Sequence, residues 1–133
     1  MPAEAAGHTR IATVLVVDDN RDTTEALANL LEAAGYRVIA VTSSTAALEA
    51  WERARHRLDL VVTDLAIPGM NGLELVRTLR ADGLSVPVVV VSGYAPPAGA
   101  PSLAAWLRKP VEVEEFLATI ERVLGGDASR TDV

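Results

Sequence analysis

Three apolar runs, at residues 13–17, 58–63 and 86–91, are rich in Val and Leu and do not alternate with polar residues. This pattern is typical of strands that are buried on both faces, because a strand with one face in water alternates apolar and polar residues. Shorter runs at residues 36–41 and 104–107 indicate two further strands. The pattern therefore predicts a parallel sheet of five strands that is covered by helices.

The segments between these strands have apolar residues at helical spacing. Apolar stripes of this period pass through residues 26–34, 73–79 and 113–124, and the last is the clearest. The signals for helix ends are a stop at Gly35, a cap at Ser43 or Ser44 before a helix that reaches about Arg55, and a cap at Asn71 before a helix that begins at Gly72. Strict alternation of strands and helices predicts an α/β fold, a doubly wound, flavodoxin-like (βα)5 domain with right-handed crossovers.

The connection after the fourth strand fits this scheme poorly. Residues 93–101 contain Pro96, Pro97 and Pro101 together with two glycines. Proline lacks an N–H group and disrupts the interior of a helix. We therefore expect a shortened, proline-rich fourth helix of little more than one turn.

Residues 1–10 and 125–133 lack apolar periodicity, so we expect flexible tails around one domain at residues 11–124. A chain of 133 residues, 50% of them apolar, is long enough for a single core.

The chain has no cysteine, which excludes thiol chemistry and suits a reducing compartment. Its net charge of -6 argues against nucleic acid as a partner, and its apolar runs are too short to span a membrane. These features predict a cytoplasmic protein.

Polar side chains follow four of the predicted strands at the point where each strand ends. Asp18 and Asp19 follow the first strand, Asp64 the third, Ser92 the fourth and Lys109 the fifth. The carboxyl ends of parallel strands meet at one edge of the sheet, where such folds bind their ligands. Neighbouring carboxylates repel one another unless a cation is present, and Mg²⁺ prefers oxygen ligands. An aspartate can also attack phosphorus and form an acyl phosphate, so this set of residues predicts phosphoryl transfer.

Four short motifs in these positions resemble those of one family. They are the acidic pair in VLVVDDN, the acceptor region DLAIPGMNG, the hydroxyl in VSGYA, and LRKP before the last helix. The chain is similar over residues 13–124 to the response-regulator receiver domains of two-component signalling. Its first part, VLVVDDNRDTTEALANLLEAAGY, is also similar to receivers attached to hybrid histidine kinases.

The resemblance implies a phosphoacceptor and a Mg²⁺ site. Asp64 resembles the phosphoacceptor of the family. Asp19 and Asp64 resemble direct Mg²⁺ ligands, and the resemblance implies that Asp18 acts largely through water. The backbone carbonyl of Ala66 is expected to complete the protein's share of the metal ligands.

The resemblance also implies roles for residues of the last two strands. Ser92 and Lys109 match the residues that contact the phosphoryl group, and the bond from Lys109 to Pro110 is expected to be cis. Trp106 matches the switch aromatic of the family, although simple core packing is the other reading of this residue. The connection between Ser92 and Lys109 is several residues shorter than is usual in the family. The resemblance therefore does not imply that this chain has the usual dimerisation and docking face.

The leading functional prediction is a Mg²⁺-dependent phosphoacceptor that receives its phosphoryl group from a sensor histidine kinase or a histidine phosphotransfer protein. Only nine residues follow Leu124, so we expect output through protein contacts with an unknown downstream protein. We expect a monomer or weak homodimer with no nucleic-acid or membrane partner. The only reactions expected of the domain are its own phosphorylation and dephosphorylation.

Three other functions compete with this prediction. A receiver-like interaction domain that acts independently of phosphorylation is favoured by the unusual fourth crossover. A hydrolase of the haloacid dehalogenase type also forms an aspartyl phosphate, but it needs an acidic residue two positions after Asp64, where this chain has Ala66. A histidine phosphotransfer domain is disfavoured because neither His8 nor His56 lies on a helix with clear apolar periodicity.

Overall fold

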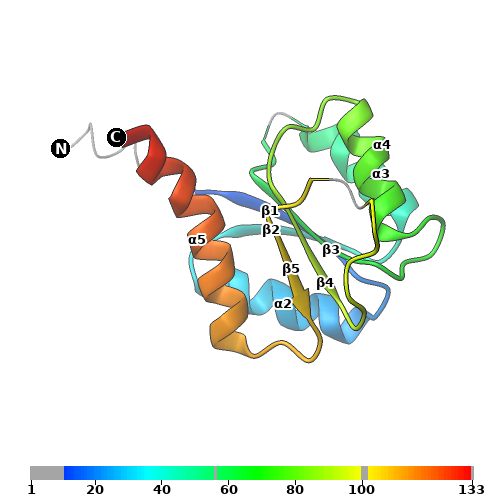
Figure 1. Ribbon diagram of the computed structural model, residues 1–133, viewed down its shortest axis with the longest axis horizontal. Helices are drawn as coiled ribbons and strands as arrows, with labels where there is room; N and C mark the ends of the chain where they lie inside the picture. Colours follow the sequence, from blue (N-terminus) through cyan, green and yellow to red (C-terminus); the bar gives the residue numbers. More distant parts are fainter. Residues whose placement is uncertain (1–10, 56, 100–101, 133) are drawn as a thin grey trace.

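The computed structural model describes residues 11–55, 57–99 and 102–132, and in this part of the chain it has one parallel sheet of five strands and four helices (Figure 1). The strands are β1 (Thr13–Val17), β2 (Arg37–Val41), β3 (Leu60–Asp64), β4 (Val88–Ser92) and β5 (Ala105–Arg108). The helices are α2 (Arg21–Ala33), α3 (Ser44–Ala54), α4 (Gly72–Ala81) and α5 (Val113–Asp132). The strand order β2-β1-β3-β4-β5 is that of the expected flavodoxin-like fold, with the switch in order between β1 and β3.

Each face of the sheet is covered by two helices (Figure 1). Leu15 of β1 belongs to a buried cluster with side chains of α3 and α4, including Trp51. Val14, the neighbouring residue on β1, points to the other face and packs in a cluster with side chains of α2 and α5, including Leu31 and Phe116. All residues of β1, β3 and β4 are buried. The prediction of a sheet buried on both faces is therefore confirmed.

The predicted elements agree closely with the observed ones. Each strand begins and ends within two residues of its predicted bounds. Asn71 caps α4, as its position before Gly72 indicates, and the structure adds a capping box with Glu74. Of the two candidate caps of α3, Ser43 holds the cap position, and its hydroxyl accepts a hydrogen bond from the N–H of Ala46. The hydroxyl of Ser44 is therefore not needed to cap the helix.

The fourth crossover differs from the prediction. Residues 93–99 and 102–104, the described parts of the connection from β4 to β5, contain no helix, so the expected short fourth helix is not found there. Pro96 and Pro97 have no N–H to donate to a helical turn. The backbone is held by side chains instead: the carbonyl of Gly99 accepts a hydrogen bond of 3.3 Å from Arg77 of α4. Pro101 lies outside the described residues.

The last helix is longer than the apolar stripe predicts. Helix α5 continues past Leu124 to Asp132, so residues 125–132, expected as a flexible tail, are helical. A glycine inside a helix lowers the stability of the helix by only about 1 kcal/mol relative to alanine, so a glycine does not by itself end a helix. The expected tail at residues 1–10 lies outside the described residues, as do His8 and His56. No helix in the described ranges is long and apolar enough to cross a membrane.

Candidate functional site

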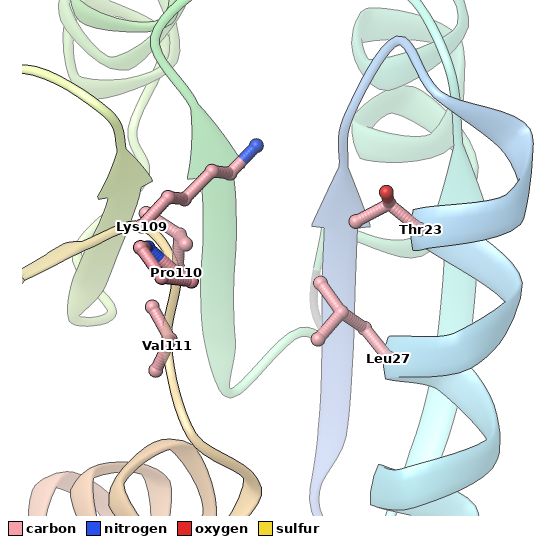
Figure 2. A pocket seen from close by; sticks show the side chains of 6 residues that line it. Thr23, Leu27, Lys109, Pro110 and Val111 are labelled. Carbon is pink, nitrogen blue, oxygen red and sulfur yellow. The ribbon is translucent and has the colours of Figure 1, made fainter.

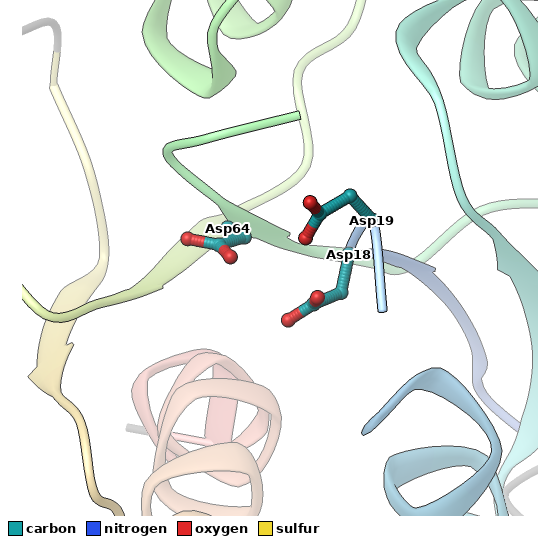
Figure 3. A group of neighbouring side chains, drawn as sticks. All are labelled: Asp18, Asp19 and Asp64. Atoms are coloured by element: carbon teal, nitrogen blue, oxygen red, sulfur yellow. The ribbon is translucent and has the colours of Figure 1, made fainter. Parts of the chain in front are cut away.

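Three aspartates meet at the carboxyl edge of the sheet (Figure 3). Val17 and Thr63 are partners in the register of β1 with β3, which places Asp18 beside Asp64. One carboxylate oxygen from each of Asp18, Asp19 and Asp64 lies within 4.8 Å of the other two. Asp18 and Asp64 are 2% and 8% exposed, whereas Asp19 is open to solvent. Parallel pairing thus brings together carboxylates that are 46 and 45 positions apart in the sequence.

Backbone N–H groups fix the orientation of the two buried carboxylates. Oδ1 of Asp18 accepts a hydrogen bond of 3.0 Å from the N–H of Asn20. Oδ1 of Asp64 accepts a bond of 2.6 Å from the N–H of Leu65 and a longer one, 3.4 Å, from that of Ala66. The Oδ2 atoms of both aspartates are thereby left to face the interior of the site.

Lys109 supplies the positive charge to this cluster. Its Nζ lies 3.0 Å from Oδ2 of Asp64 and 3.2 Å from Oδ2 of Asp18. Burial alone lowers the pKa of the Lys109 ammonium, but the hydrogen bonds to Asp64 and Asp18 and the attraction of their charges outweigh burial and raise the pKa above its ordinary value of 10.5. Lys109 therefore carries its charge throughout the neutral range. The peptide bond from Lys109 to Pro110 is cis.

Ser92 and Trp106 lie on the strands beside the aspartates. Ser92 is the last residue of β4 and is 1% exposed, and the backbone N–H of Lys109 donates to its carbonyl at 2.9 Å. Its hydroxyl accepts a hydrogen bond of 3.1 Å from the N–H of Tyr94. The indole Nε1 of half-buried Trp106 donates to the carbonyl of the same Tyr94 at 2.7 Å. The indole is thus connected to the Ser92 hydroxyl through the backbone of one residue.

The donor set fits a hard divalent cation. Three carboxylates face one ammonium group, so negative charge is in excess. Mg²⁺ and similar ions bind one or two carboxylates, carbonyl oxygens and waters. Ala66, whose carbonyl was expected to act as a ligand, lies exposed two residues after Asp64. The sites expected for a metal ion and for a phosphoryl group therefore share one edge of the sheet.

A groove of about 440 Å³ adjoins this cluster (Figure 2). It lies between α2 and the segment that follows β5. Its lining residues are Thr23, Leu27, Val91, Lys109, Pro110 and Val111. The sequence pattern did not predict this groove, because its walls come from three segments that only the fold brings together. Its walls are mainly apolar, and the aliphatic part of Lys109 belongs to them.

The fold and the site define a class: a flavodoxin-like domain with an acidic site and a lysine at the carboxyl edge of its sheet. The family model of the response regulator receiver domain matches residues 14–121. The chain is 32% identical over 121 residues to the polar-differentiation response regulator DivK of Brucella anthropi, a match covering 85% of this chain and 96% of that protein. The chain therefore belongs to the response regulator receiver domain family of two-component signalling.

Solved structures agree with this assignment. The chemotaxis response regulator CheY4 of Vibrio cholerae superposes with a TM-score of 0.79 at 30% identity, over 86% of this chain and all of that one (100%). A receiver domain protein from Clostridium thermocellum superposes with a TM-score of 0.80 over 89% of this chain and 98% of that one. Its sequence identity is 24%, so this second likeness concerns the fold alone.

Proposed function

We propose that this receiver domain accepts a phosphoryl group on Asp64 from a histidine kinase or a histidine phosphotransfer protein. The observation that supports this most directly is the 3.0 Å ion pair between Asp64 and Lys109 beside two further carboxylates. An oxygen of Asp64 attacks phosphorus and forms a new O–P bond, while the bond from phosphorus to the donor breaks and its electron pair leaves with the donor. The Lys109 ammonium neutralises charge on the phosphoryl oxygens, and the Ser92 hydroxyl donates to one of them.

The reaction is proposed to require Mg²⁺. Asp19 and Asp64 are the proposed direct ligands, Asp18 acts largely through water, and the Ala66 carbonyl completes the set. The excess of carboxylates over positive charge supports this assignment. When bound, Mg²⁺ supplies Lewis-acid stabilisation of the charge on the phosphoryl group. The domain in this proposal catalyses only its own phosphorylation and dephosphorylation.

The partners are proposed to be proteins. The groove beside Lys109 supports docking of a folded phosphodonor, because the partly buried Leu27 and Val111 present apolar surface next to Lys109, which pairs with Asp64. Such a surface has no role in a reaction with a small donor. Output is proposed to pass to a downstream protein through surface contacts, with the domain a monomer or weak homodimer.

A test of the proposed reaction is the intact mass of the protein after incubation with acetyl phosphate. We expect one phosphoryl adduct per chain with Mg²⁺ present and none when a chelator replaces it. The adduct should be lost at high pH with hydroxylamine, as an acyl phosphate is. Absence of an adduct with Mg²⁺ present, under conditions in which the protein is folded, contradicts the proposal.

A second candidate function is binding that does not depend on phosphorylation. The crossover favours it, since residues 93–99 are all exposed and Tyr94 is 69% exposed. An exposed aromatic residue in a loop held at fixed points is a suitable contact for a partner. The Asp64 variant described in the Discussion distinguishes the two functions.

We also propose that Ser92 and Trp106 report phosphorylation to this loop. A phosphoryl group that draws the Ser92 hydroxyl toward itself breaks the bond from the Tyr94 N–H, and Tyr94 carries the carbonyl that holds the Trp106 indole. In a Trp51→Phe background, beryllofluoride with Mg²⁺ is therefore expected to shift the indole emission of Trp106. The added change Ser92→Ala should remove most of the shift. An emission spectrum that does not respond, while bound beryllofluoride is detected by fluorine NMR, argues for simple packing of Trp106.

A further inference from the structure

The loop that follows Asp64 is fixed at both ends by its own backbone. It spans residues 65–71, between β3 and α4. At its start, the N–H groups of Leu65 and Ala66 donate to the Asp64 carboxylate. At its end, the N–H of Gly72 donates to the carbonyl of Leu65 at 2.7 Å, and a Cβ on Gly72 would collide with the carbonyl oxygen of Asp64. These contacts leave the middle of the loop to be held by another element.

Ser44, the first residue of α3, holds the middle of this loop. Its hydroxyl donates to the carbonyl of Pro68 at 2.9 Å and accepts from the N–H of Met70 at 3.2 Å. Its backbone N–H, which has no partner within the helix at this position, donates to the same Pro68 carbonyl at 3.0 Å. Ser44 is only 2% exposed, so water does not compete for these bonds. One side chain thus uses both its donor and its acceptor on a loop 24 and 26 positions away in the sequence.

Gly69 is fitted to this contact. Its φ of +100° lies in the left-handed region that favours glycine. A Cβ at this position would also collide with the Ser44 hydroxyl. The loop therefore passes so close to Ser44 that both the conformation and the space require glycine, and the loop is held in one arrangement.

We propose that Ser44 is a positioning residue for the Mg²⁺ site. By holding Pro68 and Met70, it fixes the loop that begins after Asp64 and that carries Ala66, whose backbone carbonyl is the proposed ligand. This inference rests on the proposed function, because it gives the Ala66 carbonyl its role as a ligand. The hydroxyl has no capping role in α3, since Ser43 is the cap.

The test compares Ser44→Ala with Ser43→Ala. The first removes the hydroxyl that holds the loop, whereas the second removes the cap of the same helix and leaves the loop bonds in place. Mg²⁺ affinity is measured by calorimetric titration, and exchange of the Met70 amide is followed by NMR. Removal of a group that positions a metal ligand weakens metal affinity by about 10-fold or more, and we expect at least about 10-fold in Ser44→Ala. Ser43→Ala should lower the melting temperature with little change in affinity.

The outcomes separate this inference from the proposed function. Faster exchange of the Met70 amide together with weaker Mg²⁺ binding in Ser44→Ala alone supports the positioning role. Faster exchange with unchanged affinity, or the same loss of affinity in Ser43→Ala, overturns it while the proposed function stands. A parent chain that binds no Mg²⁺ overturns the proposed function and this inference with it. If Ser44→Ala does not fold, Ser44→Cys, which keeps the size of the side chain but replaces the hydroxyl with a weakly hydrogen-bonding thiol, is read in the same way.

Discussion

Replacing Asp64 with Asn is expected to abolish phosphorylation by acetyl phosphate, leaving no adduct in the intact-mass spectrum at any Mg²⁺ concentration. Asparagine has the size of aspartate, and its carbonyl oxygen can still accept the bond of 2.6 Å that the Leu65 N–H donates to Oδ1. Its neutral amide is a poor nucleophile, however, and cannot form the acyl phosphate. The loss should therefore be complete in a protein that remains folded.

Asp82→Asn is the matched control for this variant. The Asp82 carboxylate also accepts side-chain hydrogen bonds, from Trp51 at 2.7 Å and from Arg55 at 2.7 Å, but it lies at the end of α4, away from the site. We expect Asp82→Asn to be labelled like the parent. Undiminished labelling of Asp64→Asn would place the acceptor elsewhere. A partner that binds the parent and Asp64→Asn equally in the presence of phosphodonor would favour the phosphorylation-independent function.

Replacing Lys109 with Ala is expected to slow phosphorylation by about 100-fold or more without weakening Mg²⁺ binding. Loss of one group that stabilises developing charge in an active site costs about 10²–10³ in rate. The ammonium lies 3.0 and 3.2 Å from two of the carboxylates, so it repels an incoming cation, and its removal should leave Mg²⁺ affinity unchanged or stronger. Stopped-flow phosphorylation and calorimetric titration measure the two effects separately.

The same variant should also be less stable in the presence of chelator. Breaking a fully buried ion pair lowers the free energy of unfolding by about 3–5 kcal/mol. Because the Lys109 side chain is 35% exposed, we expect a smaller loss of about 1–3 kcal/mol. Binding of Mg²⁺ should restore part of this loss. Arg108→Ala is the control, since Arg108 is the exposed neighbour of Lys109 and its removal changes the net charge equally. Equal effects of the two variants on the phosphorylation rate would mean that only long-range charge matters. Weaker Mg²⁺ binding in Lys109→Ala would contradict the competition between the two cations.

Much of this domain could be predicted because its signals are local. The runs of Val and Leu in β1, β3 and β4 indicate strands buried on both faces, and cap residues such as Asn71 mark helix starts. Polar residues that interrupt apolar runs lie at strand ends, and parallel strands end at the same edge. The grouping of Asp18, Asp64 and Lys109 was therefore predictable without coordinates.

The errors have physical causes of a different kind. Proline content indicated a shortened fourth helix, but the described part of the crossover contains no helix, since Pro96 and Pro97 lack N–H groups and the carbonyl of Gly99 is bonded by Arg77 of α4. Apolar periodicity ends at Leu124, whereas α5 continues to Asp132, since a helix already formed can extend without an apolar stripe. The crossover thus depends on a contact from another element, and the extension of α5 depends on the helix that precedes it, so neither is recorded in the apolar pattern of the segment itself.

The sequence by itself determined the order of strands and helices, the faces that are buried and the edge at which the acidic site lies, because each of these follows from the period of apolar residues and from strand ends. Only the tertiary structure decided which oxygen of Asp64 faces Lys109. It also decided that the buried Ser44 holds the loop at residues 65–71. A hydrogen bond requires its two atoms to meet within about 3 Å. For residues more than 20 positions apart, that distance is set by the packing of whole elements, which no local pattern of residues records.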